Sequence, residues 1–300
     1  QRQMCIRDRH MPEDKNDVLS NFAILPLFHL GTFICLFIWA CKGWALNLSA
    51  DIRDFYRDLG LMHSDAIAVA PMLMEAIYKD VKRGRRARLN GIWNPCGSSA
   101  MFYGAMLAEL AQQGMMITQV YGMTETCGDG IINYEQDEKH IRAVGRPDDH
   151  AEYKLDETGE ICIRGGCVML GYYKDPGATA EVLDADGWFH TGDLARVDED
   201  GFYYITGRRK NIIILDSGEN VSPEELEDLL SKCGAVKECI VREKGKKICA
   251  VIYCGEADQQ TVRDFITETN RTLPLYKRMS AVEFSAEPLP RTGTGKLLRK

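Results

Sequence analysis

The chain has 300 residues, 45% hydrophobic and 27% charged, a composition ordinary for globular proteins and sufficient for a sizeable core in one or two domains. The formal net charge of −7 at pH 7 excludes broad nucleic-acid binding, which needs a basic stripe, but not one local phosphate site. The most apolar run, residues 32–41, is too short to span a bilayer. Residues 1–10 are polar, lack the apolar core of a signal peptide and resemble a translated sequencing adapter, so we predict a non-native leader there.

Eleven cysteines are spread evenly along the sequence. No Cys-x-x-Cys pair occurs, and the six histidines do not cluster near cysteines. We therefore predict reduced thiols that pack as small hydrophobic side chains in a cytoplasmic protein, rather than a disulfide framework or a zinc site.

The first half of the sequence alternates short apolar runs with helical patterns. Residues 21–25 are typical of a buried strand, and an apolar helix is expected after a loop at residues 26–31. Further strands are expected at residues 65–70, 91–98 and 115–122. Two helices separate them, one with apolar residues at helical spacing (Met74, Ile77, Tyr78 and Val81) and one (Met106, Leu107 and Leu110) that Gly114 ends.

The pattern changes after Gly145. Short strands separated by Gly and Asp turns follow up to residue 207, which predicts a small barrel or curved sheet, with a hairpin turn at residues 198–201. Beyond Lys210, Ser222-Pro223 predicts a helix start with a capping box. Strands at residues 235–244 and 246–255 follow, the second apolar on both faces and hence central, and a helix then carries Val262, Phe265, Ile266 and Thr269.

These textures predict an α/β fold in which a mostly parallel sheet has helices on both faces. A small β-barrel-like subdomain and a separate small α+β C-terminal domain should follow. We expect the large domain to occupy residues 11–210, with its α/β part ending near residue 145 and its β-rich part at residues 146–210. The C-terminal domain should occupy residues 211–300.

Three polar stretches are candidates for a site. In VYGMTETCG, a Thr hydroxyl can bond a phosphate and the next carboxylate can hold Mg²⁺, although a polar loop with an ordinary N-cap Thr fits equally. Asp193, in a Thr-Gly-Asp turn, could accept both hydroxyls of a ribose or be an ordinary turn Asp. Arg208 could donate to ribose or phosphate, or lie solvated at the surface.

The third stretch, PRTGTGKLLRK, ends the sequence. Its two glycines allow a mobile loop from which Lys296 could reach a ligand as a point charge; a basic disordered tail is the alternative. It is not a P-loop, because Pro290 replaces the first required Gly and Leu297 replaces the Ser or Thr.

Nine stretches in one order resemble the adenylate-forming superfamily and, within it, the AMP-forming acyl-CoA synthetases. They are LPLFHLG, CGSSAM, YGMTE, GEICIRG, GYYKDP, GWFHTGDLARVDEDGFYYITGRRKN, ENVSPEELE, LPLYKRM and PRTGTGK. The resemblance implies ATP-dependent activation of a carboxylic acid to an acyl-adenylate, then transfer to coenzyme A.

The same resemblance implies the roles of individual residues. Thr124 would contact the AMP phosphate, Glu125 the Mg²⁺, and Lys296 both the substrate carboxylate and the α-phosphate. Asp193 and Arg208 would hold the ribose. The remaining assignments are Tyr121, Gly122, Ser98 and Ser99 around adenine, His29 and Gly122 at the acyl pocket, and Lys210 as a hinge about which the C-terminal domain rotates between half-reactions.

Two departures matter. The family's Ser/Thr/Gly-rich phosphate loop should precede LPLFHLG, and no such stretch occurs; we therefore expect an N-terminally truncated fragment that is weak or inactive alone. CGSSAM also differs from the commoner Gly-Gly-Ala-Pro-Leu pattern, which affects the adenine contacts. Two alternatives remain: an adenylation domain that loads an acyl or amino acid onto the phosphopantetheine of a carrier protein, such as an acyl carrier protein, and an inactive fragment. The identity of the acid is not encoded in any motif.

Overall fold

The computed structural model describes residues 19–25, 30–98, 104–128, 130–147, 149–215, 218–291 and 297–299. Contacts divide the chain into two units. Unit 1 comprises residues 1–155, 162–191 and 197–204, and unit 2 comprises residues 156–161, 192–196 and 205–300. The domain boundary expected at Lys210 stays a prediction. The two units are described separately below.

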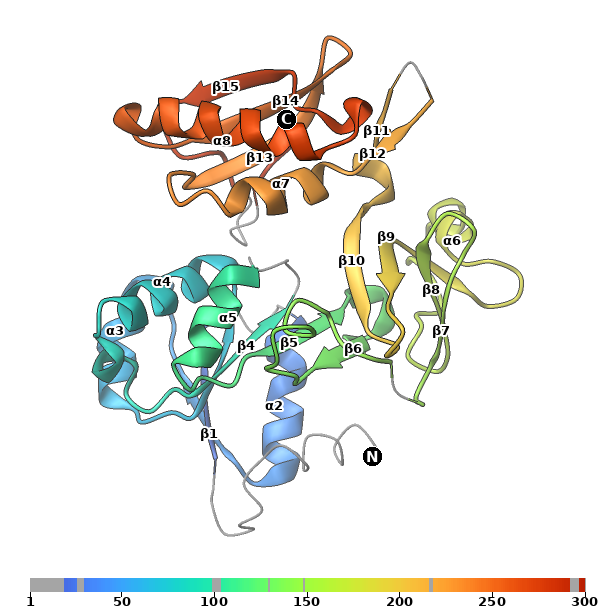
Figure 1. Cartoon of the computed structure of the whole chain (residues 1–300). Helices are drawn as coiled ribbons and strands as arrows, with labels where there is room; N and C mark the ends of the chain where they lie inside the picture. Colours follow the sequence, from blue (N-terminus) through green and yellow to red (C-terminus); the bar gives the residue numbers. More distant parts are fainter. Residues whose placement is uncertain are drawn as a thin grey trace. The chain divides into compact units, whose positions relative to one another are not determined.

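Unit 1 contains a six-stranded sheet in the order β2-β1-β3-β4-β5-β6 (Figure 1). Pairing is parallel from β2 through β5, and only β5 and β6 are antiparallel. The mostly parallel sheet predicted from the sequence is thus confirmed. The strands are β1 (Ser20–Ala23), β2 (Ala45–Leu48), β3 (Ala66–Val69), β4 (Asn94–Ser98), β5 (Thr118–Gly122) and β6 (Gly130–Asn133), of which β2 and β6 were not anticipated.

Helices cover both faces of this sheet. Successive side chains of a strand point to opposite faces. Ala66 of β3 packs with Trp39 in one cluster, whereas the next residue, Ile67, packs with Leu59 and Met74 in the main core. The α2 helix therefore lies on one face, and α3 and α4 lie on the other. The helices are α2 (Leu30–Lys42), α3 (Phe55–Leu61), α4 (Pro71–Lys82) and α5 (Gly104–Gln112).

The predicted barrel or curved sheet is a four-stranded sheet in the order β10-β9-β8-β7. Its strands are β7 (Glu152–Leu155), β8 (Glu160–Arg164), β9 (Phe189–Val197) and β10 (Tyr203–Arg208). The turn expected at residues 198–201 is present, since Gly201 N–H donates to the carbonyl of Asp198 at 3.0 Å. A short helix that was not anticipated, α6 (Pro176–Val182), lies between β8 and β9.

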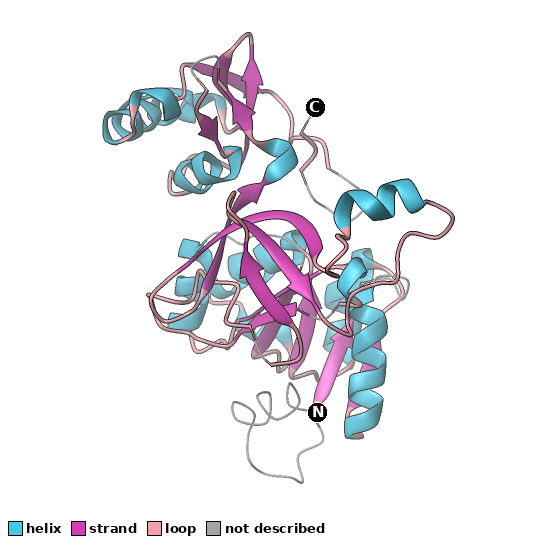
Figure 2. Cartoon of the chain, turned by 90° about the vertical axis from the view of Figure 1, so that its right-hand side faces the viewer, coloured by secondary structure: helices cyan, strands magenta, loops and turns pink. Residues whose placement is uncertain are grey.

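The C-terminal part of unit 2 has a three-stranded sheet in the order β13-β14-β15, so the doubly apolar strand β14 is central as predicted. Two helices, α7 and α8, cover one face of this sheet, and their apolar residues share one core with alternate residues of β13 and β14 (Figure 2). The elements are β11 (Ile213–Ile214), β12 (Asn220–Val221), α7 (Pro223–Ser231), β13 (Glu238–Lys244), β14 (Lys247–Tyr253), α8 (Gln259–Thr272) and β15 (Ala281–Ser285).

The predicted start of α7 is right, but the predicted capping box is wrong. The helix begins at Pro223, yet the Ser222 side chain makes no cap hydrogen bond. Its hydroxyl instead donates to the carbonyl of Thr206 at 2.5 Å. The contact requires glycine at position 207, because a Cβ there would lie 2.2 Å from Ser222 Oγ. A long-range partner has displaced the local one.

The ten cysteines within the described ranges form no disulfide. Among the same residues, no helix combines the length and the apolarity that a membrane crossing requires.

Candidate functional site

The YGMTE motif forms a tight loop at the end of β5. The strand ends at Gly122, and a single 3₁₀ turn (Thr124–Thr126) follows. The turn is closed by Thr126, whose N–H donates to the carbonyl of Met123 at 3.2 Å and whose Oγ1 accepts from Met123 N–H at 3.3 Å. Thr126 is buried, whereas Thr124 is exposed. The loop thus presents the Thr124 hydroxyl from a closed backbone.

The neighbouring strands fix where this loop lies. Ser98, the last residue of β4, pairs with Val120 of the parallel strand β5, so both strands end at the carboxyl edge, where α/β sheets bind ligands. After the loop the chain returns along β6, and Gly130 approaches so closely that a Cβ there would lie 1.8 Å from the Tyr121 carbonyl oxygen. Tyr121 is buried. The side chain of Ser98, and the whole of Ser99, lie outside the described residues.

Glu125 is contacted by a segment that sequence reasoning left without a role. The Tyr172 hydroxyl donates to Glu125 Oε1 at 2.9 Å, and Met169 N–H donates to the Glu125 carbonyl at 2.8 Å. The Glu125 side chain is only partly buried, and its carboxylate is a hard oxygen ligand of the kind that Mg²⁺ prefers. The residues present therefore fit the predicted metal role of Glu125. The motif GYYKDP carried the signal for Tyr172, but nothing local indicated its partner.

The proposed ribose pair lies within unit 2. Arg208 Nε lies 2.6 Å from Asp193 Oδ1, and the Arg208 NH2 nitrogen donates to Asp193 Oδ2 at 3.4 Å. Asp193 is only 4% exposed, whereas the Arg208 side chain is 46% exposed. The structure thus brings together two residues that the sequence predicted as one site, with the carboxylate held in a forked ion pair.

A second carboxylate, missed by sequence reasoning, supports this turn. Glu160 is 1% exposed. Its Oε1 accepts from Gly192 N–H at 2.7 Å, and its Oε2 accepts from Arg209 at 2.8 Å. Glu160 thereby links the turn that carries Asp193 to the segment that carries Arg208. A lone Glu at the start of the apolar run EICI was the available signal.

Of the other predicted site residues, the structure describes Lys210 but not His29 or Lys296. Lys210 is exposed within a 3₁₀ turn, Arg209–Asn211. His29 and Lys296 lie outside the described residues. The flanks of the Lys296 stretch are described: Leu298 N–H donates to the Pro290 carbonyl at 2.8 Å, and Arg291 and Leu297 form a β-bridge.

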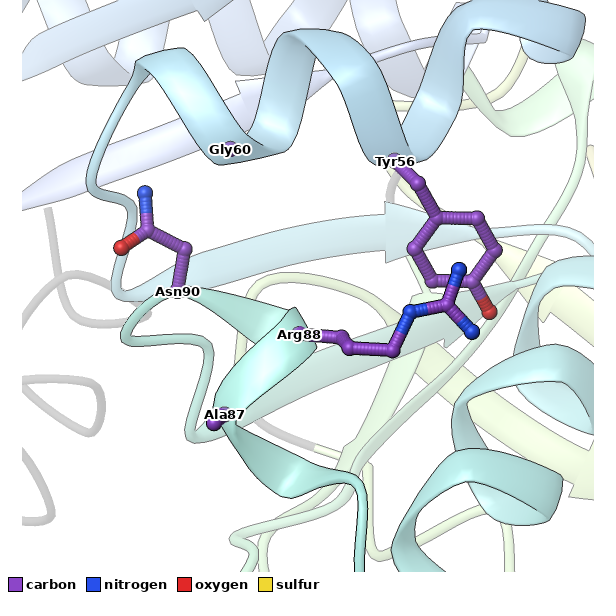
Figure 3. Close-up of a pocket in the computed structure, with 5 residues that line it drawn as sticks. All are labelled: Tyr56, Gly60, Ala87, Arg88 and Asn90. Carbon is purple, nitrogen blue, oxygen red and sulfur yellow. The ribbon is translucent and has the colours of Figure 1, made fainter.

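A cavity of about 240 Å³ lies elsewhere in unit 1, between α3 and the 3₁₀ turn Arg86–Leu89 (Figure 3). The Arg88 guanidinium lies 3.8 Å from the centre of the Tyr56 ring and 3.1 Å from the buried Asp80. Burial and the neighbouring Asp80 raise the pKa of Tyr56 to about 12. None of the predicted site residues that the structure describes lines this cavity, so it does not belong to the site.

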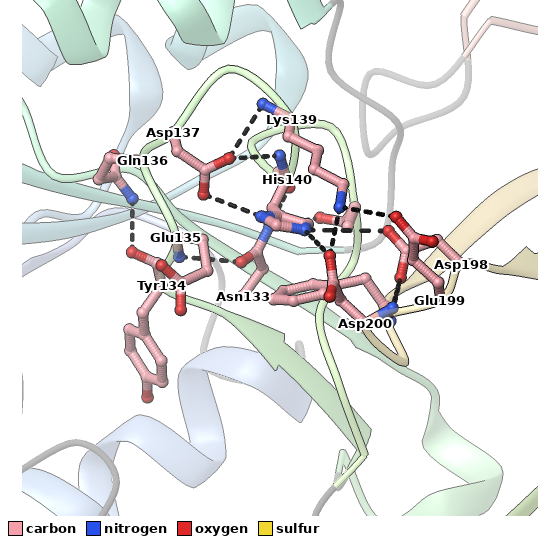
Figure 4. Close-up of polar contacts among 12 residues, drawn as sticks. Asn133, Tyr134, Glu135, Gln136, Asp137, Lys139, His140, Asp198, Glu199 and Asp200 are labelled. Atoms are coloured by element: carbon pink, nitrogen blue, oxygen red, sulfur yellow. Dashed lines mark hydrogen bonds and ion pairs between the residues drawn. The ribbon is translucent and has the colours of Figure 1, made fainter.

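A charged cluster joins the loop after β6 to the β9–β10 turn within unit 1 (Figure 4). His140 Nδ1 lies 3.0 Å from Asp137 Oδ2, and its Nε2 lies 3.2 Å from Asp200 Oδ2 and 3.9 Å from Asp198 Oδ2. Lys139 also pairs with Asp200. Desolvation would lower the pKa of His140, but the hydrogen bonds to Asp137 and Asp200 outweigh it and raise the pKa.

This cluster predicts a pH dependence of stability. Because the His140 pKa is higher in the folded state, its contribution is fully present below the unfolded pKa of about 6.5 and is lost as pH rises through the folded pKa. The wild type minus His140→Gln difference in melting temperature should therefore be larger at about pH 6 than at about pH 8. The exposed His150→Gln serves as control. A His140→Gln difference independent of pH would contradict the assignment.

Comparison with known proteins places these features in a family. The sequence model described as AMP-binding enzyme matches residues 2–173. A long-chain-fatty-acid–CoA ligase of Salmonella typhimurium is 37% identical over 295 residues, covering 92% of this chain and 52% of the relative. The corresponding ligase of Escherichia coli O157:H7 is 31% identical over 296 residues. The chain spans about half the length of these curated relatives.

Solved structures agree. The o-succinylbenzoate CoA synthetase of Bacillus subtilis in complex with ATP and magnesium has a TM-score of 0.80 and 25% identity, covering 98% of this chain and 62% of that chain. The same enzyme with an acyl-adenylate intermediate gives a TM-score of 0.79 and 26% identity, with 95% and 60% covered. The family match extends over more than half of the sequence and includes the YGMTE loop, and on that evidence the chain belongs to the AMP-binding enzymes of the adenylate-forming superfamily.

Proposed function

We propose that the protein containing this chain is an AMP-forming acyl-CoA ligase. It would react a carboxylic acid with ATP to form an acyl-adenylate and pyrophosphate. It would then transfer the acyl group to coenzyme A and release AMP. The observation that carries the proposal is the YGMTE loop: a closed turn at the carboxyl edge of the sheet that exposes Thr124 and has Glu125 fixed beside it.

The residues of unit 1 would act on the phosphates. Thr124 would donate its hydroxyl to the α-phosphate, and Glu125 would hold Mg²⁺ through a carboxylate oxygen. The metal, when bound, would neutralise phosphate charge. Tyr121 and Gly122, with Ser98 and Ser99, would border the adenine. Gly122 would also border the acyl pocket, and His29 would form part of its wall.

The residues of unit 2 would hold the sugar and supply the mobile charge. Asp193 has two oxygens that can accept both ribose hydroxyls, and Arg208 would keep that carboxylate oriented. Lys296 would bridge two anions that otherwise repel each other, the acid and the α-phosphate. Lys210 would be the hinge through which the C-terminal domain changes orientation between the two half-reactions.

We further propose a fatty acid as the substrate. The support is the naming of relatives: the Salmonella and Escherichia proteins are long-chain-fatty-acid–CoA ligases, and a Bos taurus relative is a medium-chain acyl-CoA ligase. Coenzyme A as acceptor rests on the same names.

The test is acid-dependent pyrophosphate release with ATP and Mg²⁺. The protein would be a chimera in which the Salmonella relative supplies the part that this chain does not span, and the 300-residue chain alone would be assayed beside it. We expect release with medium- and long-chain fatty acids, thioester formation with coenzyme A, and little activity from the chain alone. Release with no acid tested would overturn the proposal. Acyl transfer only to a holo carrier protein would replace coenzyme A as the acceptor.

A further inference from the structure

The segment after β8 returns to the YGMTE loop and contacts one residue of it twice. Met169 N–H donates to the Glu125 carbonyl oxygen at 2.8 Å, and the Tyr172 hydroxyl donates to Glu125 Oε1 at 2.9 Å. These partners belong to the same unit but are 47 residues apart for the side-chain contact. The backbone and the carboxylate of Glu125 are therefore both held by a single distant segment.

Tyr172 is itself held firmly. Its N–H donates to Thr179 Oγ1 at 2.9 Å, and the Thr179 hydroxyl donates to the Asp175 carbonyl at 2.8 Å. Asp175 in turn caps α6 by accepting from Ala178 N–H at 2.9 Å. The preceding Gly171 has φ +145°, and a Cβ there would lie 2.9 Å from Thr179 Cγ2. The phenol thus projects from a hydrogen-bonded platform at the start of α6.

We propose that Tyr172 is a positioning residue that orients the Glu125 carboxylate for the divalent cation. The inference rests on the proposed function, in which Glu125 holds that cation. A carboxylate has about four lone-pair sites on two oxygens, so a hydrogen bond to Oε1 leaves Oε2 able to bind the metal. Hydrogen bonds of this kind orient metal ligands, and their removal lowers metal affinity by about 10–100-fold.

The chemistry of the phenol suits this role. The Tyr172 hydroxyl is a neutral group that donates to the Glu125 carboxylate at 2.9 Å. A Tyr at this place adds a donor without adding charge, and so it does not compete electrostatically with a cation. Tyr172 is 37% exposed, so the hydrogen bond lies at the rim of the loop rather than in the core.

The test compares Tyr172→Phe with Tyr173→Phe in the chimera. Tyr173 is the adjacent residue of the same type and is 88% exposed. Two readouts are needed: the Mg²⁺ concentration for half-maximal pyrophosphate release, and direct Mn²⁺ binding in the presence of AMP, measured by electron paramagnetic resonance. The Glu125→Gln variant identifies the Mn²⁺ bound by this carboxylate, because the signal of that bound Mn²⁺ should be absent from the spectrum of the variant.

For Tyr172→Phe we expect the half-maximal Mg²⁺ concentration and the Mn²⁺ dissociation constant both to rise by about tenfold. The rate of pyrophosphate release at saturating Mg²⁺ should be nearly unchanged. Tyr173→Phe should match the wild type. Thr179→Val, which removes the acceptor for Tyr172 N–H, should shift the constants in the same direction. A lower rate at every Mg²⁺ concentration, with both metal-binding constants unchanged, would assign Tyr172 a purely structural role and overturn the inference. Mn²⁺ binding that is unchanged in Glu125→Gln would overturn it as well.

The two proposals fail differently. If no acid supports pyrophosphate release, the proposed function fails, yet the Mn²⁺ titration still reports whether Tyr172 controls the Glu125 site. If release occurs but the Tyr172→Phe constants equal those of the wild type, only the positioning role fails.

Discussion

Lys296→Ala is expected to slow acyl-adenylate formation in the chimera by about two to three orders of magnitude, the usual effect of removing one preorganised electrostatic group. The reason is the repulsion between the substrate carboxylate and the α-phosphate, which must approach each other for the bond to form. By resemblance to the family motif, Lys296 would supply a positive charge between them. A neutral methyl group leaves that repulsion unscreened in the transition state.

The measurement separates the half-reactions. Pyrophosphate release from ATP reports adenylation, and thioester formation from a supplied acyl-adenylate reports the second step. Lys296→Ala should lower only the first. Lys247→Ala, which removes an exposed lysine at the start of β14, should lower neither. Equal losses in both steps would contradict a role for Lys296 confined to adenylation.

The flanks of the Lys296 stretch explain why this variant should stay folded. Arg291 pairs with Glu238 at 2.8 Å. Arg299 forms a forked pair with Glu227, with both distances 2.6 Å. These contacts fasten the chain on either side of residues 292–296 to the C-terminal part of unit 2, and none of them involves Lys296. A loss of activity can therefore be assigned to the missing ammonium group.

Most of the fold was predictable because local patterns determined it. The apolar spacing of α4 and α8, and the doubly apolar β14, follow from the periods of helix and strand. The four-residue strands β1 and β3 are mostly buried and were predicted, whereas β2 has no buried residue and β6 has only two apolar side chains, so both were missed. The small helix α6 was missed as well, since none of its seven residues is buried and it has no apolar stripe.

The site was predictable in its residue types but not in its supporting contacts. Motif resemblance indicated Glu125 and Asp193, whereas Tyr172 and Glu160 were found only in the structure. Their partners lie 47 and 32 residues away along the sequence, beyond the reach of any periodicity argument. The capping-box prediction at Ser222 was wrong for the same reason. Its local pattern favoured a capping box, but the carbonyl of Thr206 is the partner of its hydroxyl in the folded chain.

The second large effect is expected at Glu160. Glu160→Gln should lower the free energy of unfolding of unit 2 by about 2–4 kcal/mol, the range for loss of one partner from a buried charged hydrogen-bond network. The amide keeps the shape, but its NH₂ must face either Gly192 N–H or the Arg209 guanidinium, so one donor opposes another. The Glu160 side chain is 2% exposed and the Arg209 side chain is 63% exposed. Water can therefore replace the lost hydrogen-bond partner of Arg209, but it cannot reach the buried amide NH₂ of the variant.

A matched control lies in the same turn. Glu157 is exposed three residues earlier, and Glu157→Gln should change stability by less than about 0.5 kcal/mol. Urea unfolding, monitored by hydrogen exchange of the β13 and β14 amides, would report the free energy of unfolding of unit 2. Equal stability of the two variants would show that the Glu160 contacts contribute little.

Glu160 should also affect nucleotide binding, because Gly192 N–H is bound to Glu160 and Asp193 is the next residue. Glu160→Ala removes the acceptor of that bond, so the turn that carries the carboxylate proposed to hold the ribose loses one fixed point, and we expect AMP to bind Glu160→Ala about tenfold more weakly. Arg209→Ala tests the other half of the link: it leaves the Gly192 contact intact, so it should reduce stability more than it reduces AMP affinity. If instead Arg209→Ala weakened AMP binding as much as Glu160→Ala does, the turn would be positioned through the arginine, and the Gly192 hydrogen bond would not be the contact that orients Asp193.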